Sequence, residues 1–357
     1  MFTDLEQLCV RRETSLREAI TQIDRNRLGI VLVIDDAGRL AGTVTDGDVR
    51  RAMLANPDLG QPVSVVLARK AGTKYANPIT AAITSDRETW RQIMTEQNIL
   101  HLPLVDDAQR VAGLTTLVEF VPHQDAPIQA LIMAGGEGTR LRPLTETIPK
   151  PMLPVGDRPL MEIVIEQLRD AGITQVNIAM RHLTEKISGH FGDGQKFGVA
   201  LSYVTEDRPL GTAGALGLME TPKDTLLVIN GDILTQVDFR AMLAFHRDHQ
   251  ADLTVAVRHY DVNVPYGVVE CDGSVVSRLR EKPVMRFFVN AGIYLLEPGV
   301  CGLIPHGQRY DMTDLIQRVL DAGRSVVSFP IHEYWLDIGQ SADYQLAQEH
   351  VKSWSLE

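Results

Sequence analysis

The stretch from Gln129 to Pro154, QALIMAGGEGTRLRPLTETIPKPMLP, constrains this chain more than any other part of the sequence. It opens with an apolar run, Ala130 to Ala134, that has the length and composition of a buried strand. Gly135, Gly136 and Gly138 follow directly, and these glycines allow unusual backbone angles and leave main-chain N–H groups uncovered. Amide-rich turns of this kind suit anions, above all phosphates. We therefore predict a buried strand that ends in a phosphate-binding turn.

Two cations, Arg140 and Lys150, flank this turn and strengthen the prediction of a phosphate-rich ligand. The dinucleotide fingerprint G-x-G-x-x-G does not fit, because Leu141 occupies its third glycine position when the count starts at Gly136. The P-loop does not fit either, because Thr139 and Arg140 stand where that motif needs Lys and Ser or Thr. The turn is thus neither of these two phosphate-binding motifs.

Over its whole length the stretch resembles the signature of the sugar-1-phosphate nucleotidyltransferases, which reads G-G-x-G-T-R-L-x-P-L-T and then P-K-P. Further segments follow in the order of that family, and the resemblance extends from residue 130 to residue 344. It implies an enzyme that joins a nucleoside triphosphate to a sugar 1-phosphate and releases pyrophosphate. The nucleotide-binding residues that the resemblance implies are Ala134, Gly135, Gly136, Gly138 and Thr139, with Gly211 and Thr212 in a loop along the base.

A second group of motifs resembles the family's sugar-binding segments. These motifs are P-Y-G-V at 265–268, E-K-P at 281–283 and N-A-G at 290–292. In the family, the glutamate of E-K-P contacts sugar hydroxyls and the lysine contacts the phosphate of the sugar. The resemblance therefore implies a sugar-phosphate site made of Gly267, Glu281, Lys282 and Asn290.

Two carboxylates are candidates for a metal site. Asp232 follows the apolar run TLLVI, and a carboxylate at a strand end that faces a triphosphate is suited to hold Mg²⁺. The alternative is an Asn-Gly-Asp turn that only reverses the chain. Asp337, in the segment YWLDIGQSADY, resembles the aspartate that completes the family's metal site. The resemblance thus implies Mg²⁺ held by Asp232 and Asp337.

The resemblance also assigns catalytic roles to Arg140, Lys150 and Asp232. Arg140 would bind the pyrophosphate side and Lys150 the nucleotide phosphates, so that positioning and charge neutralisation accelerate the reaction. The loop sequence L-G-T-A-G-A-L favours GTP, and the resemblance favours a mannose- or hexosamine-type sugar. One alternative is a cytidylyl- or uridylyltransferase. Another is a catalytically inactive nucleotide or sugar sensor or assembly subunit, but the charged residues that the reaction needs are all present, which favours an enzyme.

The first 122 residues contain a weak internal repeat of helix, strand, turn, strand and helix. The phrase G-T-V-T-D-G-D-V resembles the end of a CBS domain, a family whose paired members commonly bind adenosine nucleotides. Its G-x-x-T-x-x-D pattern falls on Gly42, Thr45 and Asp48, which implies that Thr45 and Asp48 bind AMP or ATP and regulate the protein. The second copy departs from the pattern at Glu119. Alternatively, Thr45 and Asp48 only cap a helix, and the pair serves dimerisation.

Strand and helix patterns alternate after residue 129, which predicts an α/β domain with a mainly parallel, doubly wound, Rossmann-like sheet. Ligands of such sheets gather at the carboxyl ends of the strands, where both Gly135 and Asp232 are expected. We predict a smaller α+β tandem CBS-domain pair at 1–122, a linker at 123–128 and a nucleotidyltransferase domain at 129–357.

Composition excludes several other classes of protein. The formal net charge of -11 argues against a nucleic-acid partner, and no apolar run reaches the ~18 to 20 residues of a membrane span. Three widely spaced cysteines indicate neither a disulfide framework nor a zinc site, which fits a reducing cytoplasm. His246 and His249 are better explained as part of a solvated helix face than as metal ligands. We expect a cytoplasmic homo-oligomer.

Overall fold

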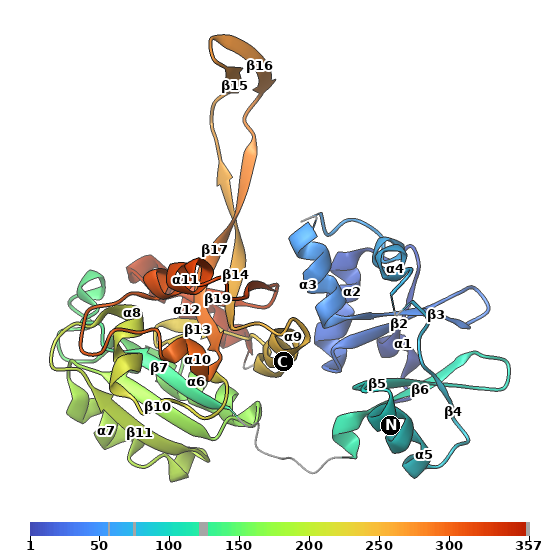
Figure 1. Ribbon diagram of the computed structural model, residues 1–357, viewed down its shortest axis with the longest axis horizontal. Coiled ribbons are helices and arrows are strands. Elements are labelled where there is room, and N and C mark those ends of the chain that lie inside the picture. The colour runs from blue at the N-terminus through green and yellow to red at the C-terminus, as the bar shows by residue number, and fades with distance from the viewer. Residues whose placement is uncertain (56–57, 74–75, 121–127, 355–357) are drawn as a thin grey trace. The chain divides into compact units, whose positions relative to one another are not determined.

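The computed structural model describes residues 1–55, 58–73, 76–120 and 128–354, and the chain divides into two compact units (Figure 1). These units are Met1–Gln124 and Asp125–Glu357. The predicted linker at 123–128 lies outside the described residues except for Ile128, which packs into the core of the second unit. The domain boundaries at 122 and 129 therefore stay predictions.

The first unit contains two small sheets of the same topology, as the internal repeat predicts. In each sheet the first strand runs parallel to the second, and the second pairs antiparallel with the third. Both antiparallel ladders contain an irregularity at the same place, after Val33 in one sheet and after Leu104 in the other. The strands are β1 (Cys9–Arg11), β2 (Ile30–Ile34) and β3 (Leu40–Thr45), then β4 (Ala81–Ala82), β5 (His101–Val105) and β6 (Val111–Thr116).

Helix α2 (Leu16–Asn26) shows why these segments form helices. A capping box joins Ser15 to Glu18 at its start, where each side chain accepts a hydrogen bond from the other residue's backbone N–H. Leu16, Ile20 and Ile23 lie on one buried face. The helices of this unit are α1 (Leu5–Leu8), α2 (Leu16–Asn26), α3 (Asp46–Ala55), α4 (Ser64–Lys70), α5 (Arg87–Glu96) and the short η1 (Leu117–Glu119).

A seven-stranded sheet organises the second unit, in the order β11-β10-β7-β12-β17-β14-β18. Six of these strands run parallel, and β17 runs antiparallel to both of its neighbours. The mainly parallel sheet predicted from the sequence is thereby confirmed. In chain order the strands are β7 (Gln129–Ala134), β10 (Gln175–Met180), β11 (Ala200–Thr205), β12 (Leu226–Asn230), β14 (Leu253–Asn263), β17 (Val284–Leu296) and β18 (Val326–Ile331).

Helices cover both faces of this sheet, because neighbouring residues of the buried strands point to opposite sides. Ile132 belongs to one apolar core and Leu131 to the other. The first core takes in α6 (Leu160–Asp170), α7 (Thr184–Phe191) and α9 (Phe239–Asp248). The second takes in α8 (Gly211–Gly214), η5 (Ala215–Leu218), α10 (Pro298–Cys301) and α11 (Met312–Asp321). The doubly wound arrangement is also confirmed.

A smaller apolar cluster fastens the segments that follow the strand ends. Leu141, Leu153, Leu234 and Ile338 are buried together in it, although they come from four distant parts of the sequence. The elements that meet there or nearby are η2 (Thr139–Leu141), η3 (Lys150–Met152), β8 (Pro154–Val155), β9 (Arg158–Pro159), β13 (Ile233–Thr235), β19 (Trp335–Asp337) and α12 (Ser341–Trp354). This cluster positions the residues of the candidate site.

A long β-hairpin projects from the sheet (Figure 1). The antiparallel strands β14 and β17 stay paired as far as Asn263 and Val284, and β15 (Val268–Asp272) and β16 (Val275–Arg280) pair beyond them. We call residues 258–289 the arm. The remaining short helix of this unit is η4 (Gln195–Phe197). Among the helices of the described residues, none combines the length and the apolar composition that a membrane crossing requires.

Candidate active site

The glycine-rich turn begins at the carboxyl end of β7, directly after the buried Ala134. Gly138 has φ +63° and precedes η2, whose first residue is Thr139, and the Thr145 hydroxyl donates a 2.7 Å hydrogen bond to the Gly138 carbonyl. A Cβ on Gly138 would lie 2.9 Å from Thr145 Cγ2, whereas a Cβ on Gly136 would meet no atom within 4 Å. Gly138 thus permits close packing, and Gly136 leaves one side of the turn uncovered, as a ligand contact requires.

The end of β12 lies against the end of β7. The N–H of Gly231 donates a 2.8 Å hydrogen bond to the carbonyl of Met133. A Cβ on Gly231 would come within 2.9 Å of that carbonyl oxygen and 3.1 Å of Pro151. Glycine is therefore required at this position by the close approach of two strand ends, and that approach brings Asp232 beside the residues that follow the glycine-rich turn.

Lys150 and Asp232 form an ion pair at this edge of the sheet. The Lys150 side chain is only 10% exposed and that of Asp232 26%. One carboxylate oxygen, Oδ2, accepts from the Lys150 ammonium, and the other, Oδ1, is buried without a hydrogen-bond partner within the part of the chain that the structure describes. Since a buried carboxylate oxygen without a donor is costly, Oδ1 is a group that a ligand would satisfy.

Asp337 lies beside Asp232, as the metal-site prediction requires. Strand β13 pairs antiparallel with β19 so that Ile233 is opposite Asp337, and the N–H of Ile338 donates a 3.0 Å hydrogen bond to the Asp232 carbonyl. Burial raises the pKa of Asp337, and the nearby charge of Asp232 raises it further, while Lys150 lowers it. Two carboxylates that repel each other in a partly buried site are neutralised by a cation.

Arg140 lies near Asp337 and Gly339. A Cβ on Gly339 would be 3.7 Å from the Arg140 guanidinium and 3.7 Å from Asp337 Oδ1. Arg140 also lowers the pKa of Asp337, against the larger effects of burial and Asp232. The structure thus brings together the glycine-rich turn and four of the charged residues predicted for the site: Arg140, Lys150, Asp232 and Asp337.

The chemistry of the two carboxylates fits a divalent cation that a phosphate ligand helps to hold. Within the described residues, no group of three or more His, Cys, Asp or Glu side chains has the arrangement of a protein-only metal site. Asp232 and Asp337 supply two hard oxygen donors, and Mg²⁺ commonly combines one or two carboxylates with phosphate oxygens and water. The unpartnered Oδ1 of Asp232 is consistent with such a ligand.

Glu206 is a site residue that the motif analysis missed. It follows β11, is only 6% exposed, and its Oε2 accepts a 3.0 Å hydrogen bond from the N–H of Leu210. Its other oxygen, Oε1, lies 2.7 Å from the position that a Cβ on Gly135 would take. Burial raises the pKa of Glu206, while the hydrogen bond from Leu210 lowers it. No motif marks Glu206 in the sequence, because it follows the edge strand β11, whose residues are half-buried or exposed.

The loop that contains Gly211 and Thr212 is held by a neighbouring segment. Gly211 has φ +81°, and a Cβ there would lie 2.4 Å from Asp311 Oδ1. The N–H of Thr212 donates to Asp311 Oδ1 at 3.1 Å, and its hydroxyl accepts from the N–H of Met312 at 2.8 Å. These polar groups of Thr212 are engaged within the chain, so a contact of Thr212 with a nucleotide base stays a prediction.

Asn290, predicted to bind the sugar phosphate, lies at the base of the arm close to the end of β12. Its side-chain oxygen accepts a 2.9 Å hydrogen bond from the N–H of Gly292. A Cβ on Gly292, which has φ +71°, would come within 2.6 Å of the side-chain nitrogen of Asn230. The N-A-G segment therefore lies near the predicted metal-binding strand end.

The other three predicted sugar-phosphate residues lie elsewhere. Gly267, Glu281 and Lys282 are on the outer part of the arm, which projects away from the sheet edge that carries Asp232 (Figure 1). They are near one another, since a Cβ on Gly267 would be 3.1 Å from Glu281 Oε2. The described arrangement thus does not bring them to the glycine-rich turn, because the arm is held straight by the ladder between β14 and β17.

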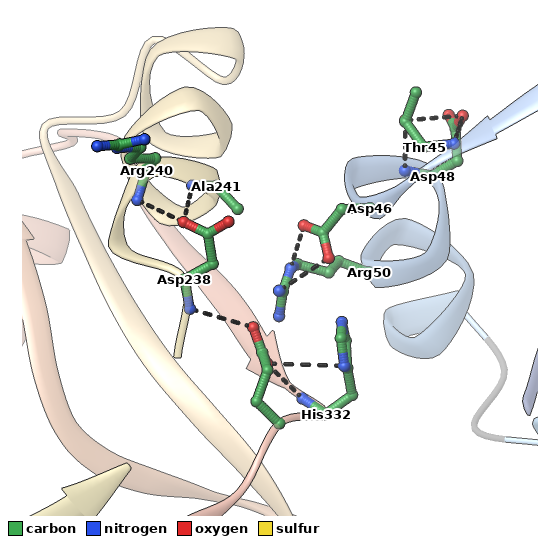
Figure 2. Close-up of polar contacts among 9 residues, drawn as sticks. Thr45, Asp46, Asp48, Arg50, Asp238, Arg240, Ala241 and His332 are labelled. Atoms are coloured by element: carbon green, nitrogen blue, oxygen red, sulfur yellow. Dashed lines mark hydrogen bonds and ion pairs between the residues drawn. The ribbon is translucent and has the colours of Figure 1, made fainter. Parts of the chain in front are cut away.

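In the first unit, Thr45 and Asp48 form the helix cap that was the alternative to nucleotide binding (Figure 2). Asp48 Oδ2 accepts from the N–H and hydroxyl of Thr45 and from the Lys70 ammonium, and Oδ1 accepts from Arg51. Burial opposes ionisation, yet Lys70 and the other donors hold the pKa of Asp48 below its ordinary value. Both carboxylate oxygens are engaged, so a role of Thr45 and Asp48 in nucleotide binding stays a prediction.

Two further details complete or correct the sequence analysis. The departure at Glu119 is accommodated structurally, because Glu119 caps η1 and pairs with the N-terminal ammonium of Met1.

The interpretation of His246 as part of a solvated helix face is wrong. His246 is 1% exposed, and its ring nitrogens lie 2.7 Å from the Thr254 hydroxyl and 3.0 Å from Glu297 Oε1. A polar pair inside the sheet–helix interface, which the local sequence does not reveal, keeps it buried.

Comparison with known proteins shows similarity over both units. Residues 129–353 match the family model described as nucleotidyl transferase, and residues 3–55 match the model of the CBS domain. A UTP–glucose-1-phosphate uridylyltransferase of Synechocystis sp. is 36% identical over 248 residues, which cover 63% of this chain and 64% of that protein. A mannose-1-phosphate guanyltransferase of Pichia angusta is 36% identical over 230 residues, 61% of this chain and 62% of the relative.

Other similar proteins agree with these. A mannose-1-phosphate guanylyltransferase of Mycobacterium tuberculosis is 31% identical over 226 residues, 61% of this chain and 62% of that protein. A solved Bacillus anthracis structure, assigned as a glucose-1-phosphate thymidylyltransferase in complex with a sucrose, has a TM-score of 0.53 and 27% identity, and covers 63% of this chain and 95% of its own. The chain spans less than two thirds of the length of the curated relatives it matches.

Proposed function

Because the chain belongs to the nucleotidyl transferase family, we propose that it is a sugar-1-phosphate nucleotidyltransferase. It would join a nucleoside triphosphate to a sugar 1-phosphate and release pyrophosphate. The observation that supports this most is the convergence of the glycine-rich turn, Lys150, Arg140 and two carboxylates at one edge of the sheet. An inactive sensor or assembly subunit would not require this set of charges.

The proposed chemistry is an in-line displacement. An oxygen of the sugar phosphate attacks the α-phosphorus of the triphosphate, the new P–O bond forms, and the bond to pyrophosphate breaks. The attacking phosphate is already a nucleophile, so the chain needs to supply position and positive charge. The N–H groups of the turn and Lys150 would bind the nucleotide phosphates, and Arg140 would neutralise charge on the departing pyrophosphate.

Asp232 and Asp337 would hold Mg²⁺, which would reduce the repulsion between the two polyanions when it is bound. In the described structure Lys150 already neutralises Asp232. In the proposed complex the Lys150 ammonium would move from Asp232 to the nucleotide phosphates. The ion pair thus keeps both groups in place before substrates arrive.

We propose GTP as the nucleotide, with Glu206 as the group that favours guanine. A carboxylate only accepts hydrogen bonds, and the Watson–Crick edge of guanine presents two adjacent N–H donors, whereas uracil and cytosine mix donor and acceptor groups there. Two of the similar proteins named above are mannose-1-phosphate guanylyltransferases, and one is a uridylyltransferase. If the chain is instead a uridylyl- or cytidylyltransferase, replacing Glu206 should change the preference for GTP over UTP or CTP very little.

For the sugar we propose a mannose- or hexosamine-type 1-phosphate, bound with the help of Asn290 beside the end of β12. Contacts from Gly267, Glu281 and Lys282 to the same sugar phosphate are part of this proposal, and they require an arrangement of the arm that brings these residues to the sheet edge beside Asn290. Binding of AMP or ATP by the first unit, a cytoplasmic location and regulation of the enzyme by adenine nucleotides stay predictions.

One experiment tests the proposed function directly. The full chain is incubated with Mg²⁺ and each of GTP, ATP, CTP and UTP against a set of sugar 1-phosphates, and pyrophosphate release is measured. We expect release with GTP and a mannose- or hexosamine-type sugar phosphate, and none after chelation of the metal. Release in no combination, from a sample that binds GTP, would identify the chain as an inactive sensor.

A further inference from the structure

Three neighbouring strands of the large sheet end at the same level. Strand β10 lies between β7 and β11 and runs parallel to both, and its last residue, Met180, pairs with the last residue of each neighbour. The residue that follows each strand therefore lies at the same edge of the sheet, and these residues are Gly135, Arg181 and Glu206. The N–H of Glu206 donates a 3.0 Å hydrogen bond to the carbonyl of Met180. In strand order, Arg181 is thus between the glycine-rich turn and Glu206.

The Arg181 side chain contacts the glycine-rich turn. Its Nη2 donates a 3.1 Å hydrogen bond to Oε1 of Glu137, although the two residues are 44 positions apart in the sequence. The Arg181 side chain is 22% exposed and that of Glu137 44%. Burial raises the pKa of Glu206, and the charge of Arg181 is among the influences that lower it. One cation therefore lies close to two carboxylates at this edge of the sheet.

Glu137 is an unfavourable residue for a turn that binds phosphate. It stands between Gly136 and Gly138, in the segment whose N–H groups are proposed to bind the triphosphate. A carboxylate within the turn lies close to any phosphate bound there, and two like charges at short range repel each other even in the presence of salt. Without a cation beside it, Glu137 would therefore weaken the binding that the turn provides.

Stability alone gives little reason for the ion pair between Arg181 and Glu137. Partly exposed pairs of this kind contribute little to the free energy of unfolding, because water screens them and both side chains lose conformational freedom. This pair joins the segment after β10 to the turn after β7, at the edge of the sheet where ligands of such folds bind. Its position therefore indicates a role in ligand binding.

From these contacts we propose that Arg181 is a nucleotide-positioning residue, whose guanidinium neutralises Glu137 so that the glycine-rich turn can accept a triphosphate. Arg181 acts through Glu137 and does not need to contact the nucleotide itself. This role rests on the proposed function, since it requires a triphosphate in the turn. It concerns the phosphates, whereas Glu206 is proposed to select the base.

The test is calorimetric titration of the full chain with Mg²⁺ and GTP, or with ATP, CTP or UTP if the wild type binds one of those more tightly. In Arg181→Gln the carboxylate of Glu137 is left beside the triphosphate, and we expect the dissociation constant to rise about 10-fold. Glu137→Gln removes the carboxylate itself, so the nucleotide should bind at least as tightly as to the wild type. In the double variant both side chains are neutral, and the dissociation constant should return to within about 3-fold of the wild-type value.

Two other roles of Arg181 predict different patterns. If the ion pair only braces the turn, both single variants bind the nucleotide more weakly, and the double variant is no better than either. If Arg181 contacts the phosphates directly, the double variant stays as weak as Arg181→Gln. Either pattern overturns the proposal.

Two controls separate charge from fold. Arg181→Lys keeps the positive charge, and its affinity should stay within about 3-fold of the wild type. Arg324→Gln removes a cation from a 3.8 Å ion pair with Asp252, which precedes β14 at the opposite edge of the sheet, and it should leave the affinity unchanged. Thermal unfolding checks that each variant is folded, which we expect because Arg181 and Glu137 lie outside the apolar cores.

Binding and turnover together separate the role of Arg181 from the proposed function. A chain that releases pyrophosphate, but whose Arg181→Gln variant binds the nucleotide as tightly as the wild type, overturns the role of Arg181 and leaves the proposed function standing. A chain that binds the nucleotide without turnover, and whose variants follow the expected pattern, supports the role of Arg181 although the proposed reaction fails. A chain that binds none of the four triphosphates overturns both.

Discussion

The ammonium group of Lys150 is paired with the carboxylate of Asp232, although the two residues are 82 positions apart in the sequence. One comes from the segment after the glycine-rich turn and the other from the end of β12. Their contact is possible because Gly231 lets two strand ends approach closely. The pair holds a cation and a carboxylate in position at the place where phosphate and metal are proposed to bind.

Replacement of Asp232 by Asn should abolish turnover, and the chain should still fold, although with lower stability because the Lys150 ammonium loses its partner carboxylate. The variant removes one negative charge beside Asp337, so the proposed metal binds weakly, and loss of such a preorganised charge costs roughly 10² to 10³ in rate or more. Pyrophosphate release measures the rate, and the thermal midpoint measures the fold. Asp343→Asn, a nearby carboxylate that accepts from the N–H of Gln340, is the control. Normal Mg²⁺-dependent turnover of Asp232→Asn would remove Asp232 from the proposed mechanism.

The two glycines Gly136 and Gly211 should respond differently to alanine. In Gly211→Ala the new methyl group meets Asp311 and Tyr310 at φ +81°, so we expect a loss of about 2–3 kcal/mol in the free energy of unfolding. In Gly136→Ala the methyl group meets no atom within 4 Å, so stability should stay within about 0.5 kcal/mol.

Gly136→Ala should keep its stability but lose affinity for the nucleotide. Its methyl group would cover the N–H groups proposed to bind phosphate, so binding weakens in a stable protein. Denaturant unfolding and calorimetric titration with GTP measure the two properties separately. Tight GTP binding by Gly136→Ala would place the triphosphate away from this turn.

Substitution of Glu206 by Gln tests base selection. The side chain keeps its shape and can still accept from Leu210, but it now presents a donor as well as an acceptor. We expect kcat/KM for GTP to fall by about 10-fold or more relative to UTP, since one good bidentate contact to a base contributes ~1–3 kcal/mol of discrimination. An unchanged ratio would mean that Glu206 does not contact the base.

Glu206 also makes a pH prediction. Burial raises its pKa in the folded chain above the unfolded value, so the folded state binds the proton more tightly. Its contribution to stability therefore increases as pH falls through the folded pKa toward the unfolded pKa, and disappears in Glu206→Gln. Unfolding of both proteins as a function of pH, compared by difference, measures this contribution. The opposite slope would show that the carboxylate is stabilised as the anion.

Asp48→Asn should destabilise the first unit. Removal of one charge from a buried contact with Lys70 leaves the ammonium without its partner carboxylate, at a cost of about 3 kcal/mol. Because the folded pKa of Asp48 is lowered, its stabilising effect is present above the unfolded pKa and is lost as pH falls through the folded pKa. Chemical unfolding of the wild type and the variant at neutral and acidic pH checks both statements.

Thermal unfolding of the wild-type chain tests whether the first unit binds adenine nucleotides. If AMP or ATP binds the first unit, the unfolding midpoint of the wild type rises with ligand concentration, because binding stabilises the folded state by mass action. Asp48→Asn is a poor probe of binding, because it also disrupts the helix cap made by Asp48. The shift of the wild-type midpoint is therefore the decisive measurement. Absence of a shift would favour a structural role for the first unit.

Sequence determined the local structure and nominated the residues of the candidate site. The apolar run of β7 and the glycines after it predict a strand and a phosphate-binding turn, and the alternation after residue 129 predicts a mainly parallel sheet. These features succeed because strand burial, helix capping and glycine conformation depend on neighbours in the chain. Asp232 and Asp337 could be nominated in the same way, by resemblance and by position after a strand.

Only the tertiary structure decided which of these groups meet. The pairing of β13 with β19 puts Asp337 beside Asp232, and the helix cap engages Asp48. Neither Glu206 near Gly135 nor the buried His246 is marked by a local pattern. The exposed face of the arm follows from strand register and from the absence of a covering layer among the described residues of its unit. Such facts are contacts between distant segments, and their energy depends on distance and burial, which a one-dimensional pattern does not contain.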